Sequence, residues 1–172
     1  MKNVLLVDGY NVMGAWPQLT RGRSLGDARD ELIHRLSAYA GFTGQRVMLV
    51  FDAWQSDATF SSVEHSPALE IVYTASGETA DHYIERASAE LAEQVAAERV
   101  KLRVASSDGV EQTVVLGRGA VRVSSRELLL EMDMAQQARG GRVSSSGARR
   151  PTVADRLPED VLAKLERMRR EQ

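Results

Sequence analysis

Five acidic residues lie at or just beyond the ends of predicted structural elements, where their carboxylates can meet: Asp8, Asp52, Glu78, Asp81 and Asp108. Carboxylates gathered in one place repel one another and need a compensating cation. The sequence has no cysteine and no suitably spaced histidine, so oxygen atoms would be the ligands, which favours Mg²⁺ or Mn²⁺ over Zn²⁺. A carboxylate-bound Mg²⁺ that keeps several waters is typical of phosphodiester hydrolysis, so the pattern indicates a nuclease.

The elements that would position these acids follow from the hydrophobic pattern. Valine-rich runs predict strands, and the first of them is apolar throughout, as in a strand buried on both faces of a parallel sheet. Apolar stripes with helical spacing lie between the runs. The predicted strands are residues 4–7, 46–51, 69–73, 101–106 and 120–124, and the predicted helices are residues 25–39, 80–97, 125–138 and 158–170. This order predicts an α/β fold with a doubly wound, mostly parallel sheet of four to five strands flanked by helices.

The acids fall at one edge of this predicted sheet. Asp8 and Asp52 end the first two strands, and Asp108 follows the fourth. Glu78 and Asp81 lie at the head of the helix over residues 80–97. Because the carboxyl ends of parallel strands share an edge, the five side chains should converge on one crevice. For a single acid such as Asp8, a simple helix or turn cap remains the alternative interpretation.

The three histidines do not compete for this chemistry. His34 lies within a helical pattern and His65 in a predicted loop, and both are expected to be solvated or structural. His82 is adjacent to Asp81. It could support a metal ligand from the outer shell.

Length and charge suggest a nuclease domain, residues 1–138, followed by a basic linker and a C-terminal helix, residues 139–172. The 172 residues suffice for one hydrophobic core, and the absence of cysteine suits a reducing compartment. No apolar run is long enough to span a bilayer and no signal peptide is visible, so a cytoplasmic protein is expected. The net charge is −6 over residues 1–138 and +4 over residues 139–172. The Gly/Ser-rich start of the basic segment is either a solvated linker or a phosphate-binding arm.

Five blocks of sequence, in order, resemble the YacP-like branch of the NYN nucleases, which are PIN-like metal-dependent ribonucleases. The blocks are LLVDGYNVMGAWP, RVMLVFDAW, GETAD, ASSDGVEQ and GRGAVRVSSRELLLEM. The resemblance covers residues 4–134 and continues more loosely into the basic segment. It implies a bacterial endoribonuclease in the cytoplasm that uses Mg²⁺ or Mn²⁺. It also implies messenger RNA and the ribosome as partners, since the family includes an enzyme that cleaves messenger RNA on the ribosome in a translation-dependent way.

The resemblance also implies roles for individual residues. Asp8, Asp81 and Asp108 match the acids of the PIN-like site, and Asn11 matches the asparagine of the NYN branch, which would contact a metal-bound water or the scissile phosphate. The supporting acids would be Asp52 and Glu78, with Ser106 or Ser107 as nearby hydroxyls. The residues expected to bind RNA are Arg122, Arg126, Arg139, Arg142, Arg149 and Arg150.

Other functions fit the sequence less well. A phosphohydrolase with an aspartyl nucleophile would need a second Asp two residues after Asp8, where this chain has Tyr10. A receiver domain and a dinucleotide-binding module lack their motifs. The main alternative is an RNA- or ribosome-binding module that keeps the fold but not the activity. Gathered carboxylates argue against it, because they would not help a surface to bind a polyanion. Stacking of a base on Tyr10, Trp16 or Trp54 is a further expectation.

Overall fold

The computed structural model describes residues 1–53, 62–66, 68–106 and 119–146, with side chains described as far as residue 140. The chain divides into two compact units, Met1–Gln137 and Ala138–Gln172. The account of the sheet, its helices and the site concerns the first unit.

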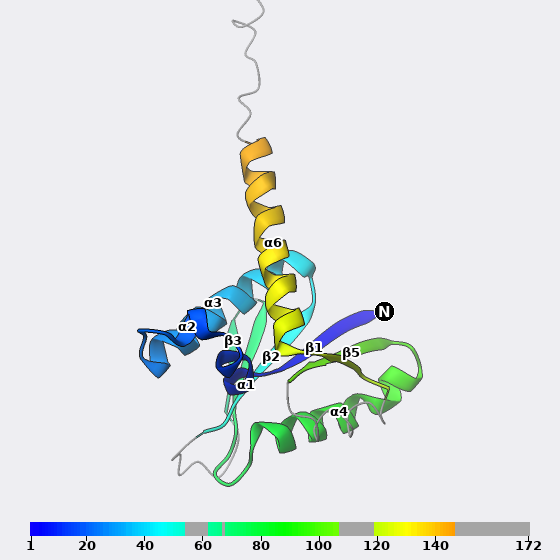
Figure 1. Cartoon of the computed structure of the whole chain (residues 1–172). Coiled ribbons are helices and arrows are strands. Elements are labelled where there is room, and N and C mark those ends of the chain that lie inside the picture. Colours follow the sequence, from blue (N-terminus) through cyan, green and yellow to red (C-terminus); the bar gives the residue numbers. More distant parts are fainter. Residues whose placement is uncertain (54–61, 67, 107–118, 147–172) are drawn as a thin grey trace, which may run out of the picture. The chain divides into compact units, whose positions relative to one another are not determined.

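A six-stranded sheet forms the centre of this unit (Figure 1). Its order is β3-β4-β2-β1-β5-β6. All neighbouring strands are parallel except β3 and β4, which are antiparallel. The strands are β1 (Lys2–Asp8), β2 (Arg46–Phe51), β3 (Ser62–Ser66), β4 (Leu69–Tyr73), β5 (Val100–Ala105) and β6 (Val121–Val123). The predicted fold class is therefore confirmed, with one strand more than the sequence suggested.

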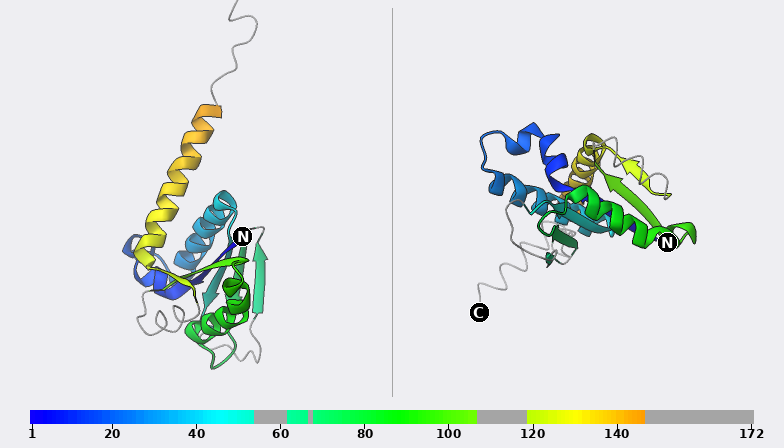
Figure 2. Two further views of the ribbon diagram at one scale, coloured as in Figure 1. Left: turned by 90° about the vertical axis from the view of Figure 1, so that its right-hand side faces the viewer. Right: turned by 90° about the horizontal axis from the view of Figure 1, so that it is seen from below.

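Helices cover both faces of the sheet, as Figures 1 and 2 show. Leu5 and Val7 of β1 belong to the core cluster that includes residues of α1, α3 and α6. The alternating residues Val4 and Leu6 belong to the second cluster, on the side of α4. The helices are α1 (Gly9–Gly14), α2 (Pro17–Thr20), α3 (Leu25–Thr43), α4 (Ala80–Ala96) and α6 (Ser125–Ser146). Burial of β1 on both faces explains its unbroken apolar run.

Local sequence sets the helix ends. The Ser24 hydroxyl caps α3 by accepting from the Asp27 backbone N–H at 3.1 Å. The helix ends at Gly44, whose φ of 68° lies in the left-handed region that glycine tolerates. Thr79 caps α4 by accepting from the His82 backbone N–H at 3.3 Å.

A polar network joins α3, β5 and α6. The Tyr39 hydroxyl donates to Glu131 Oε2 at 2.6 Å, and Arg103 Nη1 donates to the same oxygen at 3.0 Å. Arg103 Nη2 donates to the other Glu131 oxygen. Glu131 is partly buried, which by itself raises its pKa, but the bonds from Arg103 and Tyr39 hold that pKa below its usual value. The network fixes the position of α6 on the sheet.

The structure differs from the sequence predictions at three places. The antiparallel strand β3 was not predicted, because its residues are mostly exposed and lack apolar alternation. The short helices α1 and α2 were also missed. The last described helix was predicted to end at residue 138 but continues to Ser146. No proline lies between the start of this helix and Pro151 to stop it. The predicted helix over residues 158–170 lies outside the described residues.

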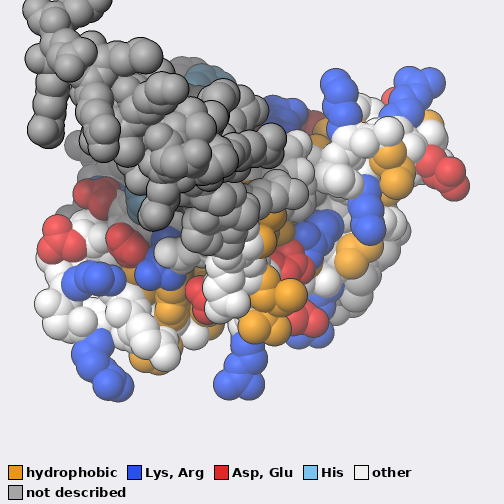
Figure 3. Space-filling view, turned by 90° about the horizontal axis from the view of Figure 1, so that it is seen from above, with side chains coloured by type: hydrophobic (Ala, Val, Ile, Leu, Met, Phe, Trp, Pro, Cys, Tyr) orange, Lys and Arg blue, Asp and Glu red, His pale blue; other side chains and the backbone are white. Residues whose placement is uncertain are grey.

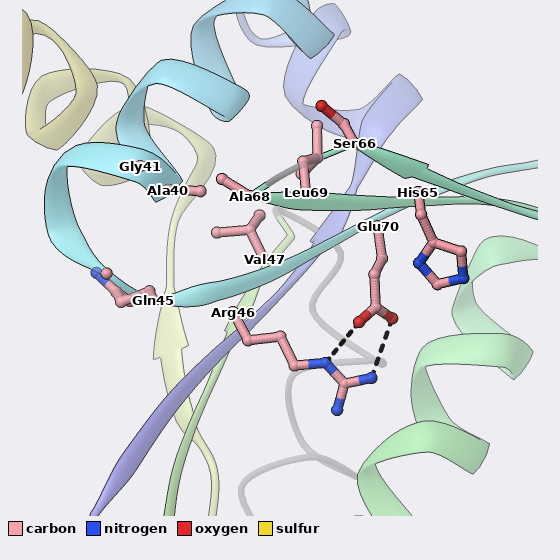
Figure 4. Close-up of a pocket in the computed structure, with 11 residues that line it drawn as sticks. Ala40, Gly41, Gln45, Arg46, Val47, His65, Ser66, Ala68, Leu69 and Glu70 are labelled. Carbon is pink, nitrogen blue, oxygen red and sulfur yellow. Dashed lines mark hydrogen bonds and ion pairs between the residues drawn. The ribbon is translucent and has the colours of Figure 1, made fainter.

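At the edge of the sheet where β2 and β4 begin, a hollow of about 430 Å³ opens between α3, β2, β3 and β4. Figure 4 shows Arg46 and Glu70, two of its lining residues, joined by two hydrogen bonds. Their two hydrogen bonds measure 2.7 Å from Nε and 3.0 Å from Nη2. This hollow lies opposite to the edge at which Asp8 and Asp52 end their strands.

The described surface carries both signs of charge. On the face shown in Figure 3, Lys and Arg side chains are interspersed with Asp and Glu. No helix in the described part of the chain is long and apolar enough to cross a membrane.

The turn from β1 into α1 depends on a glycine. A Cβ atom at Gly9 would overlap the ring of the buried Phe51, whereas one at Gly14 would meet nothing within 4 Å. We predict that Gly9→Ala lowers the free energy of unfolding by about 1–3 kcal/mol, because overpacking shifts α1. Gly14→Ala, the matched control at the other end of α1, should be neutral or stabilising by up to about 1 kcal/mol. Urea denaturation measures both, and equal stability of the two variants would contradict the packing argument.

Candidate active site

Asp8 lies where the winding of the sheet reverses. From β1 the chain crosses through α1, α2 and α3 to β2, on one side of β1. It later returns through α4 to β5, which pairs with β1 on its other side. The carboxyl end of β1 is therefore the topological switch point, where open α/β sheets bind their ligands.

The Asp8 carboxylate also caps α1. Its Oδ1 accepts a hydrogen bond from the Asn11 backbone N–H at 3.1 Å. The capping role considered as the alternative is thus present, together with the position at the switch point. The cap fixes the orientation of the Asp8 side chain.

Asp81 is brought to Asp8 by the first turn of α4. The protonated carboxyl of Asp8 has Asp81 as a hydrogen-bond partner, and the negative charges of Asp81 and Asp52 both act on it. Burial is the largest influence and raises the pKa of Asp8 to about 6. The Asn11 N–H lowers that pKa in part, and the two neighbouring acids raise it further. Three of the five predicted acids therefore lie close enough to interact.

Asp52 and Glu78 are held by other partners. Asp52 Oδ1 accepts a hydrogen bond from the Ala80 backbone N–H, which ties the end of β2 to the head of α4. Glu78 forms an ion pair with Arg86, two turns along α4. Of the two, only Asp52 acts on Asp8 through its charge, whereas Glu78 is paired with Arg86.

Asn11 is oriented by a residue that the sequence analysis did not single out. The buried Ser125 hydroxyl donates to Asn11 Oδ1 at 2.9 Å. Ser125 opens α6 directly after the capping residue Ser124, whose Oγ accepts a hydrogen bond from the Glu127 N–H at 3.1 Å. The predicted helix already began at residue 125, as α6 does, but no sequence signal reveals the contact of Ser125 with Asn11.

The remaining predicted site residues are distributed as follows. Ser106 is buried at the end of β5. The arginines Arg122, Arg126 and Arg139 are exposed. His82 is exposed at the head of α4. The other predicted site residues lie outside the described part of the chain: Asp108, Ser107, Trp54, Arg149, Arg150 and the side chain of Arg142.

The carboxylates of the described residues supply part of the ligand set that Mg²⁺ or Mn²⁺ would need. Within the described ranges, no three acidic or histidine side chains are placed to hold one ion. Mg²⁺ is commonly bound through only one or two carboxylates together with waters and substrate phosphates. Asp8 and Asp81 supply such a pair, and the negative charge of Asp81 contributes to the raised pKa of Asp8.

The raised pKa of Asp8 predicts how the stability of the metal-free protein depends on pH. The folded pKa of about 6 exceeds the reference value of 3.8, so the folded state loses stability as the pH rises through this interval. Asp8→Asn keeps a capping oxygen but removes the charge. In EDTA at pH 8 it should raise the melting temperature by about 2–6 °C, corresponding to about 1–2 kcal/mol, with a smaller gain at pH 5.

The control is Asp30→Asn, which removes an exposed carboxylate from α3. It should change the melting temperature little at either pH. A lower melting temperature for Asp8→Asn at pH 8 would mean that the carboxylate is held by favourable bonds rather than by repulsion.

Comparisons with known proteins identify the family to which the chain belongs. The chain is 38% identical over 170 residues to the protein YacP of Bacillus subtilis (strain 168), covering 98% of this chain and 97% of that protein. The crystal structure of Rae1 (YacP) from Bacillus subtilis has a TM-score of 0.69 and 37% identity, covering 97% of this chain and 94% of that one. A mutant of the same protein gives a TM-score of 0.71 and 38% identity, over 87% and 86% of the two chains. The family model for the YacP-like NYN domain matches residues 5–170, and the chain belongs to this family, whose fold is of the PIN-like nuclease type.

Proposed function

We propose that the protein is a Mg²⁺- or Mn²⁺-dependent endoribonuclease that hydrolyses RNA phosphodiester bonds, with messenger RNA on the translating ribosome as its substrate. The observation that carries this proposal is the Asp8–Asp81 contact at the switch point of a nuclease-type fold. A partly buried carboxylate with a second negative charge beside it is costly to the fold, and a bound cation would lower that cost.

Asp8 and Asp81 would hold the ion, with Asp108 as a further ligand. When bound, the ion supplies a water of lowered pKa and offsets the charge of the phosphate. Asn11 would orient the scissile group through its side-chain amide, a hydrogen-bond donor whose carbonyl oxygen is fixed by the Ser125 hydroxyl. A phosphate oxygen accepts hydrogen bonds from such a donor.

Asp52 and Glu78 would act from outside this pair. The bond from the Ala80 N–H to Asp52 sets where α4 begins, and hence where Asp81 stands. The Glu78–Arg86 pair places a cation two turns along the same helix. Loss of either acid should reduce activity less than loss of Asp8 or Asp81.

Binding of RNA needs cations outside the acidic edge, since residues 1–138 carry a net charge of −6. Arg122 and Arg126 would contact the RNA backbone. The arginines after residue 138 would dock the protein on the ribosome, where ribosomal RNA presents a dense array of phosphates. The competing proposal is a module with this fold that binds RNA or the ribosome without cleaving.

Cleavage assays separate these two functions. We predict that Asp8→Asn and Asp81→Asn each abolish cleavage of a reporter messenger RNA in a translation extract, and that EDTA abolishes cleavage of purified RNA wherever wild type cuts it. Asp52→Asn and Glu78→Gln should retain measurable activity. The matched control is Asp30→Asn, which should cleave like wild type.

The same assay compares a translated messenger with a copy whose start codon is removed. Cleavage of the translated copy alone supports ribosome dependence. Equal cleavage by wild type and Asp81→Asn would refute the assignment of these acids and favour the inactive binding module.

The basic segment generates a separate prediction about docking. Changing Arg139, Arg142, Arg149 and Arg150 together to Ser should weaken co-sedimentation with ribosomes and flatten its dependence on salt, because each phosphate that is no longer neutralised removes somewhat less than about one unit of slope. The melting temperature should stay unchanged. If the quadruple variant sediments like wild type across a salt titration, the segment is only a linker.

A further inference from the structure

A second concave surface lies beside the acidic edge. It is a groove of about 720 Å³ between the α1–α2 segment, α3 and the first part of α6. The groove is lined by Trp16, Arg23, Arg35, Arg126, Leu130 and Asp133, among others. Its arginines outnumber its acids, in contrast to the acidic character of the domain as a whole.

The aromatic and apolar part of the groove is held in place. Trp16 packs partly buried against the main core cluster. The Arg35 guanidinium lies 4.8 Å from the centre of its ring. Arg35 is itself fixed by Glu31 at 2.8 Å and by Asp133 at 3.7 Å. On the α6 side, Leu130 is 60% exposed, so an apolar surface faces the solvent at the groove.

Two cations of the groove are not held in ion pairs with described residues. Arg23 and Arg126 are exposed and form no ion pair with any acid in the described part of the chain. Arg23 Nη1 donates to the Leu19 carbonyl at 3.3 Å, which holds the guanidinium at the groove without cancelling its charge. The groove therefore combines fixed aromatic and apolar surface with two available positive charges.

The groove is continuous with the acidic edge through α1. Asp8 caps one end of this helix and Ala15 the other, a span of about 10 Å at 1.5 Å per residue. The Ser125–Asn11 bond joins the start of α6 to α1, and Arg126 directly follows Ser125. Figures 1 and 2 show α1 next to the start of α6. A single extended strand could contact both surfaces.

We infer that this groove binds unpaired nucleotides of single-stranded RNA next to the bond to be cut, an inference that rests on the proposed function. Bases would pack on Trp16 and Leu130, while Arg23 and Arg126 would contact phosphates. Aromatic stacking combined with arginines is how proteins bind single strands without reading their sequence. The groove also supplies positive charge that the acidic edge lacks.

Binding of a short fluorescein-labelled single-stranded RNA, followed by fluorescence anisotropy, tests the inference. All proteins carry Asp81→Asn so that the probe stays intact. Arg23→Ser with Arg126→Ser should weaken binding and lower the slope of log affinity against log salt by about 0.7 for each phosphate that is no longer bound. Trp16→Leu should weaken binding at least about fivefold with an unchanged slope, and Trp16→Phe should restore most of it.

The matched control for charge is Arg99→Ser with Lys101→Ser, two exposed cations that do not line the groove. It should bind RNA nearly as wild type does. Melting temperatures check that Trp16→Leu is folded, and the arginine pair tests the groove even if that variant is not.

The outcomes separate this inference from the proposed function. If the groove variants bind RNA like their parent, the inference is wrong, whether or not wild type cleaves RNA. It is also wrong if they bind RNA normally but no longer bind ribosomes, because the groove would then receive a protein surface. If they lose RNA binding while wild type cleaves nothing, the groove is a single-strand binding surface and the nuclease proposal fails.

Discussion

The contact between Asp8 and Asp81 is the interaction on which the site depends. Burial and neighbouring negative charge raise the pKa of Asp8 to about 6, so near neutral pH the fold holds a carboxylate that would be more stable in water. Two features keep it there: the N–H of Asn11 fixes Asp8 at the end of β1, and the Ala80 N–H bond to Asp52 fixes the start of α4. The rest of the domain supports these two positions.

This arrangement explains why the capping contact of Asp8 also has a place in the proposed chemistry. Asp8 caps a six-residue helix, too short to be stable alone, whose other anchor is the packing of Val12 and Met13 in the core. The same helix holds Asn11 against Ser125, and Trp16, which lines the groove, follows two residues after the helix ends. A shift of α1 would therefore move the acid, the amide and the groove together. We infer that the close fit of Gly9 on Phe51 is what makes this helix a rigid support.

The sequence predicted the parts of the fold that bury long apolar runs. The strands of residues 46–51 and 69–73 match β2 and β4 at both ends, because their apolar residues are almost continuous. The exposed strand β3 has no such signal, because His65 and Glu64 face solvent. It is defined by its antiparallel pairing with β4, which its own sequence does not reveal. Likewise, the acids could be assigned to one edge from strand order alone, whereas the Ser125–Asn11 bond joins residues 114 positions apart and needed the structure. The assignment of Asp108 to the site remains a prediction.

The most direct measurement of the central claim is the pKa of Asp8 itself, followed by carboxyl-carbon NMR with and without Mg²⁺. The account predicts a value near 6 in EDTA. In saturating Mg²⁺ the midpoint should fall well below its metal-free value, because a bound cation favours the charged form. An Asp8 midpoint that is the same in EDTA and in Mg²⁺ would contradict the claim that Asp8 and Asp81 together bind a divalent cation.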